Sequence, residues 1–150
     1  MRAVTQTAID LAKTFEGFKP ARYYDLAGNP TIGYGHLILA GSPYWDETLT
    51  EPEGEALLAQ DMATKAAAPL CELASAEIIA ALSDNRYSAL LDFVFNEGIG
   101  HFATSTMWHL IQQNLLSQVG DEFGKWVYAG GKIQQGLVKR RAAEAALWNE

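Results

Sequence analysis

Residues 15–37 have the sequence FEGFKPARYYDLAGNPTIGYGHL, and this stretch decides the fold. Upstream of it, apolar residues recur at helical spacing after Thr7, a good N-cap residue, and Gly17 supplies a left-handed stop after Glu16. Within the stretch, aromatic and β-branched residues flank the turn signal Ala-Gly-Asn-Pro at 27–30. The sequence therefore predicts a short helix that ends at Glu16, followed by a small antiparallel hairpin.

The rest of the chain is predicted to be mostly helical. A capping-box pattern at Thr50 and Glu53 opens a helix that runs towards Pro69, and Ser83 opens a second helix with a continuous buried face. Further helices are predicted over 105–113, 117–128 and 137–148. The fold class is therefore α+β, a single domain over 1–150 with a small lobe at about 12–48, containing the β hairpin, and a larger, mostly helical lobe at about 49–150.

Composition and charge exclude several classes of protein. The chain has 150 residues, of which 49% are apolar and 19% charged, as in a single globular domain. Eleven basic and 18 acidic residues give a net charge of −7, which argues against nucleic-acid binding. Neither a signal peptide nor a run of 18 apolar residues is found, so we expect no membrane span. Histidines and the single cysteine form no cluster at metal spacing, and we expect no metal and no cofactor.

Two carboxylates and a hydroxyl flank the predicted hairpin: Glu16 ends the helix, Asp25 leads into the turn, and Thr31 starts the returning strand. Glycoside hydrolysis uses two carboxyl groups in one cleft, one protonated and one ionised. A helix C-terminus beside apolar side chains favours a protonated Glu16, whereas turn amides favour an ionised Asp25. Spacing alone is also compatible with an ordinary helix-end residue and a turn former.

A family resemblance separates these two interpretations. Glu16, eight residues, Asp25, five residues and then TIGYGHL at 31–37 resemble the motif of the phage-type lysozyme (endolysin) family of T-even and lambdoid phages. Similar segments continue over 49–61, 90–105, 125–131 and 136–144. The resemblance implies a lysozyme-like fold with a cleft between its two lobes. It also implies a muramidase that hydrolyses the β-1,4 bond between N-acetylmuramic acid and N-acetylglucosamine without a cofactor.

The resemblance also implies roles for individual residues. Glu16 would be the proton donor, Asp25 the second catalytic carboxylate, and Thr31 the hydroxyl that helps to seat the attacking water. Attack by water implies inversion with the carboxyl groups about 6.5–9.5 Å apart, whereas about 5–5.5 Å would favour retention through a covalent intermediate on Asp25. The positions that match cleft-lining residues of the family are Leu37, Phe95 and Ser105.

Two further contacts follow from the resemblance. His36 is expected to pair with Asp61, which would tie the hairpin lobe to the first long helix. An arginine near the C-terminus reaches the catalytic glutamate in this family, and Arg140 and Arg141 are both candidates. The run 139–141 is otherwise typical of a solvated helix face.

The implied partner is bacterial peptidoglycan. We expect a monomer without stable membrane insertion that is made in the host bacterial cytoplasm and reaches the wall through a holin-type pore. Residues 51–100 hold nine acidic and two basic residues, whereas 125–150 hold five basic and two acidic ones. Because peptidoglycan is anionic, we expect the basic C-terminal helix to lie along the cleft and the acidic helices to face away from it.

Two alternatives remain open at this point. A lytic transglycosylase also uses a glutamate but needs neither water nor aspartate, so the presence of Asp25 and Thr31 argues against it. A non-catalytic wall-binding module on a degenerate lysozyme fold would have lost Glu16 or Asp25, and this chain has kept both.

Overall fold

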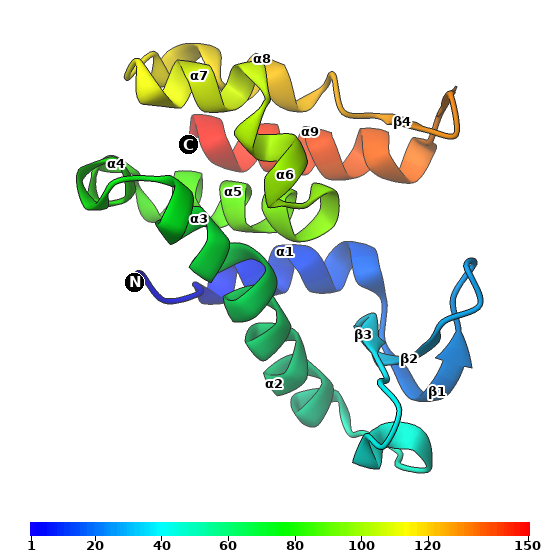
Figure 1. Ribbon diagram of the computed structural model, residues 1–150. Helices are drawn as coiled ribbons and strands as arrows, with labels where there is room; N and C mark the ends of the chain where they lie inside the picture. The colour runs from blue at the N-terminus through cyan, green and yellow to red at the C-terminus, as the bar shows by residue number, and fades with distance from the viewer.

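The computed structural model describes residues 1–150 and consists of helices around a small sheet and a second hairpin (Figure 1). The elements in chain order are α1 (Gln6–Glu16), β1 (Lys19–Tyr24), β2 (Pro30–Gly33), β3 (His36–Leu37), η1 (Pro43–Trp45), α2 (Glu51–Met62), η2 (Ala63–Ala67), α3 (Ala68–Leu73), α4 (Ala76–Ala81), α5 (Asp84–Glu97), α6 (Ile99–Ala103), α7 (Thr106–Gln112), η3 (Leu116–Gln118), α8 (Gly120–Phe123), β4 (Tyr128–Ala129), β5 (Lys132–Ile133) and α9 (Gln135–Asn149). The expected α+β, helix-dominated fold is confirmed.

The N-terminal segment has the expected helix followed by antiparallel strands. The N-cap of α1 is Thr5 rather than Thr7, and α1 ends at Glu16, followed by the C-cap Gly17, which has φ +69°. The strands form an antiparallel sheet in the order β1–β2–β3, in which Thr31 lies opposite Tyr23 on one side and Leu37 on the other. The third strand extends the predicted hairpin and brings His36 beside the strand of Thr31.

The sequence predicted a long helix that runs towards Pro69. In the structure, the helical path after the sheet continues past Pro69. Glu53 accepts hydrogen bonds from the backbone N–H and the hydroxyl of Thr50, both at 2.7 Å, so the predicted helix start is confirmed. A π-helical turn, η2, separates α2 from α3, and Pro69 lies in the first turn of α3. Proline lacks an N–H and crowds the preceding helical turn. The wider π-helical turn accommodates Pro69, so the helical segment continues from α2 into α3.

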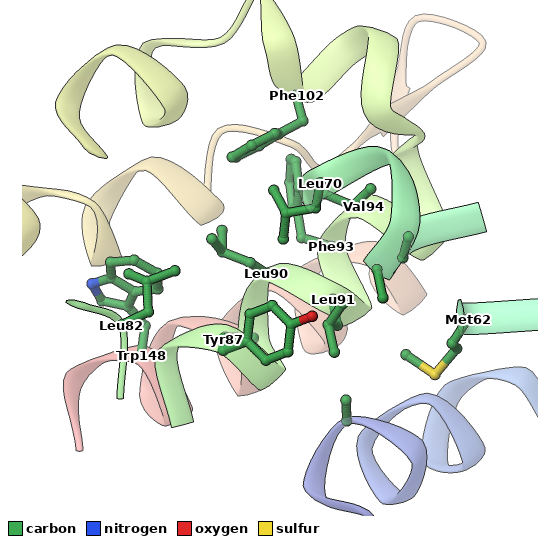
Figure 2. Packing of buried hydrophobic residues seen from close by; sticks show 14 of the residues in the cluster. Met62, Leu70, Leu82, Tyr87, Leu90, Leu91, Phe93, Val94, Phe102 and Trp148 are labelled. Carbon is green, nitrogen blue, oxygen red and sulfur yellow. The ribbon is translucent and has the colours of Figure 1, made fainter. Parts of the chain in front are cut away.

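The core of the molecule is built around α5, which lies between α1 and α9 (Figure 1). Figure 2 shows side chains of α5 packed together with Leu70 of α3, Phe102 of α6 and Trp148 of α9. Tyr87 is fully buried and donates its hydroxyl hydrogen to the carbonyl oxygen of Arg2 at 2.9 Å. Because α5 is buried along most of its length, it is a rigid support for the residues that it carries.

The C-terminal third differs from the prediction in one segment. The helix expected over 117–128 is confined to η3 and α8, and β4 and β5 form a hairpin after it. The pair Gly130 and Gly131, expected to stop a helix, instead adopts φ values of +58° and +75° in the two-residue turn of this hairpin. Such turns need positive φ at both central positions, which glycine adopts readily. None of the helices combines the length and apolar character that crossing a membrane requires.

Candidate active site

Glu16 is the last residue of α1, and its side chain is 26% exposed. Its Oε1 accepts a hydrogen bond from Nη1 of Arg140 at 2.7 Å. Its Oε2 faces Gly35, where an added Cβ would lie 3.6 Å away. A hollow of about 240 Å³ opens beside this carboxyl group and is lined by Glu16, Tyr34, Gly35, Lys65, Phe95 and Asn96. One oxygen of Glu16 is therefore fixed by an arginine, while the other borders an open space.

Arg140, on α9, is the arginine that reaches Glu16. Its Nε and Nη2 donate to the two carboxylate oxygens of Asp92 on α5, at 2.8 and 2.7 Å. The side chain of Asp92 is 0% exposed and that of Arg140 is 5% exposed. Burial alone would lower the pKa of Arg140, but the hydrogen bonds and charge of Asp92, together with Glu16, outweigh it and raise that pKa. The guanidinium is thus a fixed cation shared by two carboxyl groups.

Asp25 lies in the turn between β1 and β2, where turn groups hydrogen-bond both of its oxygens. Oδ1 accepts from the backbone N–H groups of Ala27 at 2.9 Å and Asn29 at 2.8 Å, and Oδ2 accepts from Nδ2 of Asn29 at 3.1 Å. The backbone and side-chain hydrogen bonds from Asn29 lower the pKa of Asp25, with smaller help from Ala27 and Gly28. The expected ionised state of Asp25 follows from these contacts.

Thr31 is buried on β2, and its hydroxyl donates to the backbone carbonyl oxygen of Asn29 at 3.0 Å. Because its hydrogen is used there, Oγ1 can act towards a water molecule only as an acceptor. Asn29 therefore holds Asp25 through its N–H groups and Thr31 through its carbonyl oxygen.

Tyr23 lies opposite Thr31 in the sheet. Burial raises the pKa of Tyr23, and the charges of Glu16 and Asp25 raise it further. Both negative charges therefore disfavour the ionised form of the Tyr23 phenol.

His36 and Asp61 are in contact, as the resemblance implied. Nδ1 of His36 on β3 lies 3.0 Å from Oδ2 of Asp61 on α2, and Nζ of Lys65 lies 3.1 Å from the same oxygen. Asp61 is buried, so the imidazole of His36 and the ammonium group of Lys65 meet one carboxylate that is largely shielded from solvent. Lys65 is also part of the hollow beside Glu16 and belongs to the π-helical turn η2.

The three predicted sugar-contacting residues lie in different surroundings. Phe95 lines the hollow with Glu16, and Leu37 is 41% exposed beside Thr31 in the sheet. Ser105 is buried at the N-terminus of α7, where its hydroxyl donates to the carbonyl oxygen of Phe102 at 2.7 Å and accepts from the N–H of Trp108 at 3.1 Å. The structure thus gives Ser105 the role of a helix cap and does not bring it to the hollow.

The interpretation of 139–141 as a solvated helix face is wrong for its two arginines, which are buried. Arg141 is fully buried and donates to Glu97 at 3.2 Å, Asn96 at 2.9 Å and Glu144 at 2.7 Å. These partners lie on α5 and α9, so the positive charges are compensated inside the protein. The charge of a segment does not indicate which face its side chains occupy.

Glu144 is fully buried within this cluster. Burial is the main cause that raises the pKa of Glu144 far above its ordinary value, and a hydrogen bond with Asp92 raises it further. Burial lowers the pKa of its neighbour Arg141, but an arginine starts so high that its guanidinium keeps its proton. The raised pKa favours the neutral form of Glu144, whose Oε1 accepts a hydrogen bond from Arg141 and whose Oε2 has no hydrogen-bond partner.

Sequence analysis missed three residues around the candidate site. Asp92 binds Arg140, Asn29 binds Asp25 and Thr31, and Lys65 lines the hollow beside Glu16. The one available signal for Asp92 was an acidic residue on the helix turn between Leu91 and Phe93, inside a stretch that is otherwise apolar. Asn29 was assigned only to a turn, and nothing in the sequence indicated that Lys65 lies near Glu16.

Comparisons with known proteins point to one family. The family model described as phage lysozyme matches residues 13–144. An endolysin of Acyrthosiphon pisum secondary endosymbiont phage 1 is 34% identical over 149 residues, which cover 97% of both chains. An endolysin of Bacillus phage PZA is 31% identical, and the chain spans about half of that protein, 55% of its length. Among solved structures, a point mutant of P22 lysozyme superimposes with a TM-score of 0.86 at 28% identity, and the match covers both chains completely.

Proposed function

Because the chain belongs to the phage lysozyme family, whose members degrade peptidoglycan, we propose that it cleaves the β-1,4 bond between N-acetylmuramic acid and N-acetylglucosamine with Glu16 as the general acid. The observation that carries the proposal is that the two carboxyl oxygens of Glu16 have different surroundings. Oε1 is held by Arg140 at 2.7 Å, and Oε2 borders the hollow beside Gly35. Oε2 is thus the oxygen from which a proton can pass to a glycosidic oxygen bound in that hollow.

The second half of the reaction is assigned to Asp25 and Thr31. A water molecule between them can donate one hydrogen to the Asp25 carboxylate and the other to Oγ1 of Thr31, whose own hydrogen is committed to Asn29. Its lone pair then points away from both groups and can attack the anomeric carbon. The leaving oxygen takes the proton of Glu16, and Asp25 accepts the proton that the water loses.

Direct attack by this water predicts inversion at the anomeric carbon. Phe95 and Leu37 are assigned to the sugar-binding surface, because Phe95 borders the hollow and Leu37 is exposed beside Thr31. Ser105 is left out of this assignment, since its hydroxyl caps α7. Proton donation by Glu16 and proton acceptance by Asp25 need no cofactor.

The enzyme acts on the bacterial cell wall, as the endolysin relatives indicate. The finer expectations of a monomer, of synthesis in the host cytoplasm and of passage through a holin-type pore stay predictions. So does the division into a small lobe at about 12–48 and a larger lobe at about 49–150.

The proposal is tested by the loss of turbidity of purified peptidoglycan, with products analysed by mass spectrometry and NMR. Wild-type protein should give products with reducing ends, and NMR should show the inverted anomer first. Glu16→Gln should fold normally and lose lysis, whereas Glu77→Gln, a control at an exposed helix position, should behave as wild type. Full activity of Glu16→Gln would end the proposal. Anhydro-muramic acid products would instead identify a lytic transglycosylase.

A further inference from the structure

Asp92 is a buried carboxylate that reaches the proposed active site through another residue. Its side chain is 0% exposed, and both of its oxygens are used by Arg140, at 2.7 and 2.8 Å. Figure 1 shows α1, α5 and α9 side by side, and these helices carry Glu16, Asp92 and Arg140. Asp92 itself does not line the hollow beside Glu16. Any effect that Asp92 has on the reaction must therefore pass through the guanidinium.

We propose that Asp92 is a positioning residue, which orients the Arg140 guanidinium and neutralises its charge so that Arg140 fixes Glu16 in place without withdrawing the proton that Glu16 must deliver. This inference rests on the proposed general-acid role of Glu16. It adds a residue that touches neither substrate nor reacting atoms.

The need for such a residue follows from the contact between Arg140 and Glu16. A cation at hydrogen-bond distance favours the ionised form of a carboxyl group, and a general acid must be protonated before it acts. The guanidinium is 5% exposed, so solvent screens its charge only weakly. A paired carboxylate on the opposite edge of the guanidinium is the direct way to offset that charge.

The geometry of the Arg140 guanidinium shows how Asp92 can position this group as well as neutralise its charge. Asp92 occupies Nε and Nη2, which leaves Nη1 as the nitrogen that is directed at Oε1 of Glu16. Such two-point contacts fix the plane of a guanidinium, because rotating it would break both hydrogen bonds. The guanidinium carbon also lies 5.6 Å from the ring centroid of Phe15, one residue before Glu16. Arg140 therefore has a single orientation, set from the core by α5.

The other charged and titratable groups around the Arg140 guanidinium do not replace Asp92 as the partner that neutralises its charge. Glu144 on α9 lies 3.8 Å from Nε of Arg140, about 1 Å farther than the oxygens of Asp92, and burial raises its pKa, which favours its neutral form. Arg141 is paired with Glu97 and hydrogen-bonded to Glu144. On the solvent side, Lys65 of η2 lines the hollow beside Glu16, and the charge of Glu16 acts on the Tyr23 phenol of β1. Asp92 is the buried carboxyl group that hydrogen-bonds to Arg140.

The inference is tested by pH–activity profiles of kcat and KM on purified peptidoglycan fragments. Asp92→Asn keeps the shape of the side chain and removes its charge. In the pH profile of kcat for Asp92→Asn, the fall in activity on the basic side (the basic limb) should move to lower pH by about one unit or more. At neutral pH, kcat should therefore fall by about tenfold, whereas kcat at acidic pH should stay near wild type. KM should change little, because Asp92 does not touch substrate.

Two further variants keep the test decisive. Asp92→Glu retains the charge but displaces the guanidinium, so kcat should fall while the basic limb stays in place. Glu122→Gln removes another buried carboxylate, which lies on α8 and pairs with Lys125, and its profile should match wild type. A wild-type basic limb in Asp92→Asn, with only a lower melting temperature, would overturn the inference.

If Asp92→Asn fails to fold, Asp92→Glu decides the matter, and a basic limb displaced to lower pH in that variant would overturn the inference. Glu16→Gln, measured alongside, separates the two proposals. An active Glu16→Gln would defeat the general-acid role itself, whereas an inactive Glu16→Gln with an unmoved limb in Asp92→Asn would defeat only the role of Asp92.

Discussion

Replacing Glu144 by glutamine should change how the stability of the protein depends on pH. The folded protein keeps a proton on Glu144, because burial and the contact with Asp92 raise its pKa far above the ordinary 4.5. The unfolded chain releases this proton above about pH 4.5. The folded state therefore holds more protons than the unfolded state between that pH and the raised pKa, and Glu144 makes the protein less stable as pH rises through this range.

The size of the effect follows from the same linkage. One proton difference changes the free energy of unfolding by about 1.4 kcal/mol per pH unit, which amounts to about 2.5 kcal/mol between pH 5 and pH 7. In Glu144→Gln, the amide can donate to Asp92 and its oxygen can accept from Arg141, so the contacts of the neutral acid are reproduced without a titrating group. Between pH 5 and pH 7, the free energy of unfolding of the variant should therefore rise relative to that of wild type by about 2.5 kcal/mol.

Urea unfolding followed by tryptophan fluorescence at pH 5, 6 and 7 measures this difference directly. Glu150→Gln is the matched control, because that glutamate is exposed at the chain end and should leave the difference from wild type independent of pH. Stability curves of Glu144→Gln and wild type that run parallel from pH 5 to pH 7 would show that Glu144 is ionised in the folded protein.

Three other substitutions have distinct expected outcomes. Ser105→Ala should lose the cap of α7 and about 1 kcal/mol of stability in urea unfolding, with kcat/KM unchanged; a large fall in kcat/KM would restore its role at the sugar cleft. Gly54→Ala should lower stability by about 1–3 kcal/mol, because its Cβ would lie 2.5 Å from Cε2 of Phe18; an unchanged melting temperature would contradict this packing. Gly35→Ala, at φ +88°, should cost about 1–2 kcal/mol and lower kcat, because its methyl group faces Oε2 of Glu16; wild-type kcat would argue against a proton delivered from that oxygen.

The segments that could be predicted are those in which local signals agree with the tertiary structure. The helix stop at Gly17, the helix start at Thr50 and Glu53 and the cap at Ser83 use hydrogen bonds or backbone angles that close within a few residues. The hairpin at β4 and β5 was missed, because a pair of glycines serves equally well as a helix stop and as a tight turn. Local chemistry did not distinguish these two uses.

The candidate site was predictable to the same extent. The family motif marked Glu16, Asp25 and Thr31, which lie within one continuous stretch of chain. The contact between Glu16 and Arg140 joins residues 124 positions apart, and the sequence left Arg140 and Arg141 equally possible. Helix periodicity places neighbouring residues about 100° apart around the axis, so the choice depended on a helix orientation that tertiary packing sets.

The two halves of the proposed site are held by different parts of the molecule. Glu16 is positioned from the core, because Arg140 is fixed by Asp92 on the buried helix α5. Asp25 and Thr31 are positioned by the turn at Asn29, whose sheet is joined to α2 by the contact between His36 and Asp61. Substitutions in the core should therefore alter proton donation, whereas substitutions in the sheet should alter the placement of water. Because the two sets share no hydrogen bond, a core variant and a sheet variant combined should show additive losses in log kcat. Strong coupling between them would mean that the sheet and the core move as one unit.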